Sequence, residues 1–293
     1  MNFKMEAKMK KLCVLLGICL ALLGGCALAE TAENNPLAEY ALTSGVPVEI
    51  DLNGDGTIET LTYTAETDET LGGEFARIEV GTAQGTTVGW NTQTLFMTSA
   101  YAVDIDGDGA VEVFICGDWA SSDYATYCLH YLDHGDHGEI ELLSFANADR
   151  GDENEGYNLY GYGYIQSVNG NELVLCGSQD VLGTYFGTRT FALVDGVFEF
   201  ADDGLWRFDT SDVDWEYRAL TPTQDIAATF VDGDVQTEGA IEAGTRFVIT
   251  ASDKTSVAWF RTEDGREGFF SIAPDTERGW GMKVNGVSEE ELF

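Results

Sequence analysis

Two nine-residue stretches of the chain place oxygen-bearing side chains at alternate positions of a glycine-rich turn. They are Asp51-Leu-Asn-Gly-Asp-Gly-Thr-Ile-Glu59 and Asp104-Ile-Asp-Gly-Asp-Gly-Ala-Val-Glu112, and the second starts 53 residues after the first. Calcium takes about six to eight oxygen ligands, which closely spaced carboxylates on a tightly turning backbone can supply. An acidic turn without metal is the other interpretation. The repetition of the spacing and of both glycines favours calcium.

The expected calcium ligands are the side chains at the first, third, fifth and ninth positions of each stretch. They are Asp51, Asn53, Asp55 and Glu59 in the first copy, and Asp104, Asp106, Asp108 and Glu112 in the second. An EF-hand is excluded because its bidentate glutamate would fall on Thr62 or Ile115, and because strands are predicted on both sides of each stretch. The calcium is therefore expected to order a turn between strands.

The elements that must hold these turns are predicted to be short strands. From residue 46 onward, β-branched and aromatic runs alternate with Gly, Asp and Asn, and no convincing helix interrupts them. An Asn-Gly turn after Val168 and an Asp-Gly turn after Val194 predict two hairpins. The strands expected up to residue 200 are 46–50, 59–64, 76–80, 95–103, 111–116, 124–132, 139–145, 160–168, 172–176, 184–194 and 197–200. The predicted fold class is all-β.

The composition divides the chain into five segments. Residues 1–29 are expected to be a signal peptide, 30–45 a polar tether, 46–201 the calcium-binding β domain, 202–218 an acidic linker, and 219–293 a small β-barrel. The barrel rests on five expected strands, at 226–230, 240–242, 246–251, 256–262 and 268–272. The last residues, SEEELF, fit either a final helical turn or a frayed tail.

The N-terminus has the pattern of a targeting segment. Lys8, Lys10 and Lys11 form a positive region directly before the apolar run from Leu12 to Gly25, which is short for a membrane span. Leu23-Gly-Gly-Cys26 resembles the lipobox of bacterial lipoproteins, in which the cysteine carries lipid, whereas Ala27-Leu-Ala29 is typical of an ordinary cleavage site. The chain is therefore expected to be an exported, cell-surface lipoprotein attached to the membrane only by its lipid, with secretion as the alternative.

The net charge of the chain bears on which ligands it can bind, and its cysteine content bears on whether it contains a disulfide. The net charge of −36, from 51 acidic and 15 basic residues, argues against nucleic-acid binding, which needs clustered Lys and Arg. After the signal segment only Cys116, Cys128 and Cys176 follow Cys26. A Cys116–Cys128 disulfide and three buried free thiols are both open, and the second is favoured because free cysteine is often a core residue.

The strand–turn–strand context of both stretches resembles the FG-GAP or VCBS repeats of integrin-type propellers and bacterial surface proteins. In that family the loop lies within a propeller blade and its calcium is structural. The resemblance implies a partial β-propeller-like domain, because only two copies are present, and Glu replaces the commoner Asp at the ninth position. The C-terminal segment, with turns such as Thr262-Glu-Asp-Gly-Arg266, is similar to bacterial Src-homology-3-like barrels.

The expected function is a non-catalytic, extracellular calcium-binding module that binds or scaffolds an unidentified surface protein or glycan. All three histidines, at 130, 134 and 137, lie in one stretch, which fits a zinc site or the tip of a hairpin. No nucleophile-elbow motif is present for a Ser-His-acid triad. The alternative is a cell-surface hydrolase acting on polysaccharide or peptidoglycan, with one of the many acids as general acid. An accessory subunit of a surface complex is a third possibility.

Overall fold

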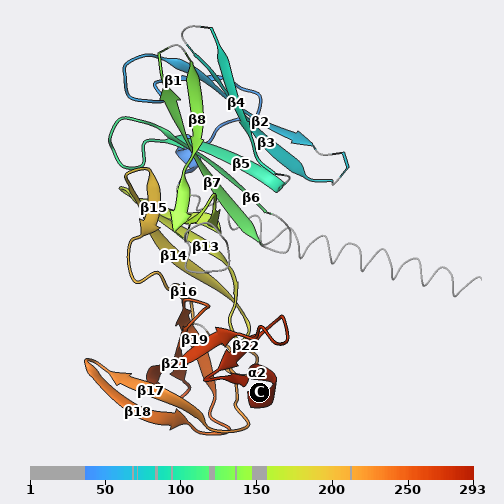
Figure 1. Ribbon diagram of the computed structural model, residues 1–293, viewed down its shortest axis with the longest axis vertical. Helices are drawn as coiled ribbons and strands as arrows, with labels where there is room; N and C mark the ends of the chain where they lie inside the picture. Colours follow the sequence, from blue (N-terminus) through green and yellow to red (C-terminus); the bar gives the residue numbers. More distant parts are fainter. Residues whose placement is uncertain are drawn as a thin grey trace, which may run out of the picture.

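Strands make up most of the described chain and helices almost none, as the computed structural model shows (Figure 1). The structure describes residues 37–67, 69–70, 72–82, 85–93, 95–118, 123–135, 137–146, 157–211 and 213–293. The expected signal peptide, Cys26 and residues 30–36 of the expected tether lie outside these ranges. In the described part, no helix has the length and apolar character needed to cross a membrane. The all-β prediction is confirmed.

The first four strands form an antiparallel sheet, the first unit. It contains β1 (Val48–Ile50), β2 (Glu59–Thr67), β3 (Glu74–Gly81) and β4 (Thr87–Asn91), in that spatial order. Along β2 the apolar side chains of Leu61 and Tyr63 are buried, while Thr60, Thr62 and Thr64, which alternate with them, are only partly covered. This alternation is the pattern of a strand with one face on the core.

The second unit repeats this antiparallel arrangement with β5 (Phe96–Val103), β6 (Glu112–Asp118), β7 (Tyr124–Asp133) and β8 (Gly138–Leu142). Its central strand β6 is buried on both faces. Val113 and Ile115 pack into the core shared with the first unit, whereas Phe114 and Cys116 pack into a second core on the opposite face. A short strand, β11 (Gly161–Tyr162), pairs with β7 beside β8.

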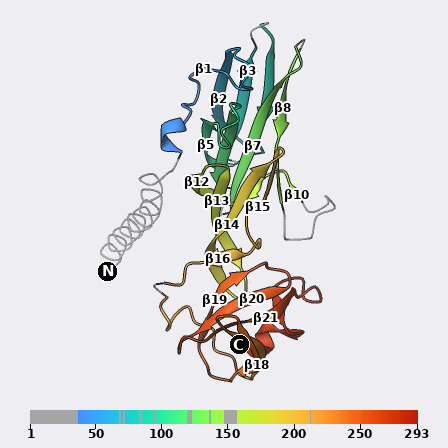
Figure 2. The ribbon, with the colours of Figure 1, turned by 90° about the vertical axis from the view of Figure 1, so that its left-hand side faces the viewer.

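The third unit covers that second core. It consists of β12 (Tyr164–Asn169), β13 (Glu172–Asp180), β14 (Thr184–Val194) and β15 (Val197–Phe200), again antiparallel. Two short strands, β9 (Ser144–Ala146) and β10 (Tyr157–Asn158), extend it beyond β15. Phe114 of β6 packs against Phe198 of β15, with ring centroids 6.1 Å apart. The three units are therefore stacked face to face in chain order along the long axis (Figures 1 and 2).

The C-terminal residues form the opposite end of the molecule from the first unit (Figures 1 and 2). We call residues 219–293 the C-terminal unit. It holds β17 (Ile226–Asp232), β18 (Val235–Ile241), β19 (Phe247–Ser252), β20 (Val257–Thr262), β21 (Glu267–Pro274), β22 (Met282–Val284), β23 (Val287–Ser288) and the short helix α2 (Glu289–Leu292). Its main strand order is β19-β20-β21-β17-β18, with β22 and β23 beyond β21. Among the described residues no sheet closes into a barrel.

Two segments expected to lack regular structure carry core residues. The segment 202–218 contains β16 (Trp206–Phe208), which pairs with both β14 and β19, and Trp206 is only 1% exposed. In the expected tether, the described part begins with the buried Leu37, continues into the 3-10 turn η1 (Ala38–Tyr40), and pairs Ala41 with Tyr101. Burial of each such large apolar side chain stabilises the folded state by about 1.5–3 kcal/mol, so these segments join the core although their neighbouring residues are polar.

Candidate metal centre

The two acidic stretches occupy equivalent positions in consecutive units. The first joins β1 to β2 and the second joins β5 to β6, so each connects the first and second strands of its unit. In the third unit a tight turn at Gly170 takes this place between β12 and β13. The 53-residue spacing in the sequence therefore corresponds to one four-stranded unit of the fold. We call the stretches the first loop (51–59) and the second loop (104–112).

The second loop gathers three exposed carboxylates. Oxygen atoms of Asp104, Asp106 and Asp108 lie within 4.8 Å of one another. The loop backbone fixes them: Gly109 N donates to Asp104 Oδ2 at 3.1 Å, and Ala110 N donates to Asp108 Oδ1 at 2.8 Å. Mutual repulsion makes such a group costly without a counter-ion, and hard oxygen ligands at this spacing suit calcium.

The first loop repeats the same backbone hydrogen bonds. Gly56 N donates to Asp51 Oδ2 at 2.8 Å, and Thr57 N donates to Asp55 Oδ1 at 2.6 Å. This bond from Thr57 is the main reason why the pKa of Asp55 is lowered, so its carboxylate stays charged. Here Asn53 replaces an aspartate, which leaves the first loop with fewer negative charges than the second.

One carboxylate oxygen of the first loop fits a bound cation. Asp51 Oδ1 is buried and has no hydrogen-bond partner among the residues that the structure describes. A buried carboxylate oxygen without a donor is unfavourable, and a metal ion would satisfy it. Asp51, Asn53 and Asp55 would hold such an ion in the first loop, and the three aspartates would hold it in the second.

The ninth-position glutamates are buried and are bonded to the backbone of their loops. Glu59 and Glu112 are 1% and 2% exposed, and each Oε2 accepts a hydrogen bond at 3.0 Å, from Leu52 N and Ile105 N respectively. The group of close carboxylates in the second loop does not include Glu112. Burial raises the pKa of Glu59, and it raises the pKa of Glu112 to about 7. Oε2 of each glutamate therefore holds the backbone of its turn, and the role of both side chains as calcium ligands stays a prediction.

The two loops are in direct contact. Val111 N, at the end of the second loop, donates to Leu52 O of the first at 2.8 Å. A Cβ atom added to Gly54 would lie 2.9 Å from Gly109 O, so the backbones meet where only glycine fits. The backbone of each loop therefore packs directly against the backbone of the other.

We expect this contact to show in a pair of matched substitutions. Gly54 and Gly107 hold the same loop position and both have positive φ, but a Cβ at Gly107 meets nothing within 4 Å. Gly54→Ala and Gly107→Ala share the backbone strain of about 1 kcal/mol, whereas Gly54→Ala adds a clash of about 1–3 kcal/mol. Urea unfolding should therefore show a larger loss of stability for Gly54→Ala. Equal losses would mean that the loops are not pressed together.

The structure adds one acidic residue that the motif does not contain. Asp133, at the end of β7, is close enough to the first loop for its charge to contribute to the raised pKa of Glu59. Tyr131 of the same strand is 3% exposed, and its hydroxyl has no hydrogen-bond partner among the described atoms. Asp133 lies more than 70 residues from the first loop in sequence, so no local signal could have revealed it.

Two of the histidines and the three cysteines considered in the sequence analysis occupy a hairpin turn and buried positions in the sheets. His134 and His137 lie in the connection between β7 and β8, and His134 Nε2 is 3.2 Å from Glu139 Oε2. This is the expected hairpin tip, although Asp136 lies outside the described residues. Cys116, Cys128 and Cys176 are free and buried, as favoured from the sequence. Burial raises the pKa of Cys116 to about 11, so its thiol is not a ready nucleophile.

The fold and the site define an all-β protein with two linked acidic loops between strands. Comparisons with protein-family models, with curated proteins and with solved structures found no match for the chain. The functional interpretation therefore rests on the sequence and on the geometry of the loops.

Proposed function

We propose that the protein is a non-catalytic calcium-binding module, in which two calcium ions order the loops that join the first and second strands of two stacked sheets. The observation that carries this proposal is the same set of backbone-to-carboxylate hydrogen bonds in both loops. The same residue types at the same spacing therefore fold into the same turn twice, which is the arrangement that a repeated metal site needs. The buried, unpartnered Asp51 Oδ1 supports it independently.

The arrangement of the units also supports the finer fold assignment that we propose. Three consecutive four-stranded antiparallel units are stacked face to face, and the loops recur at one position within them, as in an FG-GAP- or VCBS-type propeller. The stack is open, so we propose a partial propeller-like domain. For the C-terminal unit we propose a Src-homology-3-like arrangement of strands that stays open.

We further propose that the protein acts outside the cell, where it binds or scaffolds a surface protein or a glycan. The basic and apolar N-terminal pattern and the Leu23–Cys26 stretch support export and a lipid anchor at Cys26. The strong acidity supports a setting in which divalent cations are abundant. Calcium would then serve the shape of the module, and any partner would contact other surfaces.

Calorimetric titration of the full chain with calcium tests the proposal. We expect two ions per chain, with the second loop binding more tightly because it offers three carboxylates where the first offers two and an amide. The double substitution Asp104→Asn with Asp108→Asn should remove one of the two ions.

The matched control removes the same number of charges from a different turn. Asp232→Asn with Asp234→Asn changes two exposed acids at the tip of the β17–β18 hairpin and should leave both ions in place. If the unaltered chain binds no calcium at millimolar concentration, the proposed function is wrong. If both double variants lose affinity equally, the effect is one of overall charge and not of the loop.

A further inference from the structure

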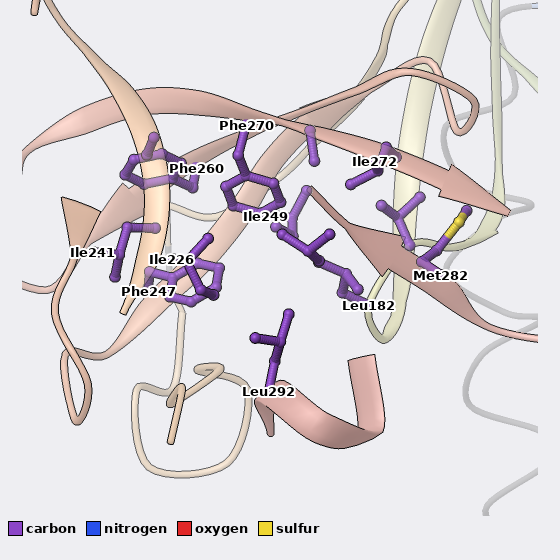
Figure 3. Packing of buried hydrophobic residues seen from close by; sticks show 14 of the residues in the cluster. Leu182, Ile226, Ile241, Phe247, Ile249, Phe260, Phe270, Ile272, Met282 and Leu292 are labelled. Carbon is purple, nitrogen blue, oxygen red and sulfur yellow. The ribbon is translucent and has the colours of Figure 1, made fainter. Parts of the chain in front are cut away.

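The turn between β13 and β14 carries apolar side chains where a surface turn would carry polar ones. Val181 is 0% exposed and Leu182 is 7% exposed. Both belong to the same hydrophobic cluster as the strands of the C-terminal unit. In Figure 3, Leu182 points into this cluster among Ile249, Met282 and Leu292. The tip of a hairpin from the third unit is therefore part of the core of another unit.

The backbone of this tip is held in a conformation that leucine rarely adopts. Leu182 has a φ of 54°, in the left-handed region that favours glycine or asparagine. Such a conformation persists only where the surroundings fix it. Val181 N donates to Gly183 O at 2.8 Å, and Thr184 Oγ1 donates to Asp180 Oδ1 at 2.7 Å, so polar groups close the base of the turn. The burial of the Leu182 side chain accounts for its position.

The C-terminal unit receives this tip on the open side of its sheet. Its own contribution to the cluster comes from inward-facing residues of all six strands from β17 to β22 and from Leu292 of α2. Because the sheet does not close into a barrel, these side chains need a cover from outside the unit. Trp206 of β16, with 1% exposure, and Tyr185 of β14 complete the cover beside the tip.

We propose that the Val181–Gly183 tip completes the hydrophobic core of the C-terminal unit. Without the tip, that unit does not keep its fold. The segment 219–293 is then not an autonomous binding module, because the tip from the same chain covers its apolar face. Unfolding of the third unit would withdraw the tip and release the C-terminal unit with it, whereas loss of the tip alone would release only the C-terminal unit. This inference goes beyond the proposed calcium function and does not depend on it.

Hydrogen exchange of the full chain, followed by mass spectrometry, tests the proposal. Leu182→Asn keeps a residue that tolerates positive φ but puts a polar amide into the apolar cluster. We expect amides of β19–β22 to exchange roughly ten-fold faster or more, and those of β2 and β3 to change less than about two-fold. The control is Phe186→Ala, since Phe186 lies on the same hairpin and is 53% exposed. It should leave both regions unchanged.

A second variant guards against a general loss of folding. Leu182→Gly removes the side chain without adding a polar group and eases the backbone, so it should give the same selective pattern with a smaller rise. Unchanged exchange in β19–β22 in both variants would overturn the proposal, because the tip would then be dispensable. An equal rise in β2, β3 and β19–β22 in both variants would overturn it as well, since the tip would then stabilise the whole chain and not this unit.

Discussion

Calcium is expected to raise the free energy of unfolding of the metal-free protein by about 5 kcal/mol. A ligand that binds only the folded state at about 100 times its Kd contributes about 2.7 kcal/mol, and two loops contribute about twice that. The physical source is the cluster of Asp104, Asp106 and Asp108, whose repulsion the ion removes, together with the unpartnered Asp51 Oδ1. Urea unfolding in excess calcium and in chelator, at equal ionic strength, measures the difference.

The controls for this prediction separate ligation from screening. Magnesium prefers a compact octahedral shell with several waters, so it should stabilise the protein much less than calcium at the same concentration. Asp104→Asn with Asp108→Asn should lower the effect of calcium to about half, because the first loop keeps its ion. A free energy of unfolding that is the same in calcium and in chelator would contradict the metal assignment for both loops.

Much of the fold could be predicted from local patterns in the sequence. The Asn-Gly and Asp-Gly turns at Gly170 and Gly196 mark hairpins, and the structure has them between β12 and β13 and between β14 and β15. The loops lie between strands, as predicted, because each follows and precedes an apolar run. These features depend on neighbouring residues, which is why sequence alone revealed them.

What the sequence could not predict depends on contacts between distant residues. The acidic neighbours of Trp206 gave its segment the composition of a linker, yet its ring is buried at the contact between β14 and β19. Leu182 falls between the expected strands 172–176 and 184–194, and nothing near it in the sequence indicates its burial because its partners in the cluster lie far along the chain. The same holds for Asp133 beside the first loop. The hydrolase alternative stays a prediction from sequence.

The ninth position of each loop shows the limit of reasoning from spacing. Spacing placed Glu59 and Glu112 in the ligand set, and this assignment stays a prediction because spacing does not determine the side-chain conformation. In the structure, the Oε2 atom of each glutamate accepts a hydrogen bond from the N–H of Leu52 or Ile105. The result is a buried carboxyl group that braces the turn and whose charge is poorly solvated.

Glu112→Gln is therefore expected to stabilise the metal-free protein at pH 8 by about 3 kcal/mol. Burial raises the pKa of Glu112 from 4.5 to about 7 in the folded state. A carboxyl group with a raised pKa in the folded state lowers the free energy of unfolding when it is ionised. For Glu112 this loss of stability is absent below its pKa of 4.5 in the unfolded state, grows between pH 4.5 and 7, and is complete above pH 7. Gln keeps an oxygen that accepts from Ile105 N but carries no charge.

The pH dependence identifies the buried charge as the cause. In chelator, the difference between Glu112→Gln and the unaltered protein should fall from about 3 kcal/mol at pH 8 to near zero at about pH 3.5, where the carboxyl is mostly protonated in both states. The matched variant is Glu59→Gln, which alters the equivalent acid of the first loop, whose pKa burial also raises. It should stabilise in the same direction. A gain in the free energy of unfolding that is constant with pH would mean that packing causes it. No gain at pH 8 would show that the hydrogen bonds of the folded state already offset the burial of the Glu112 charge.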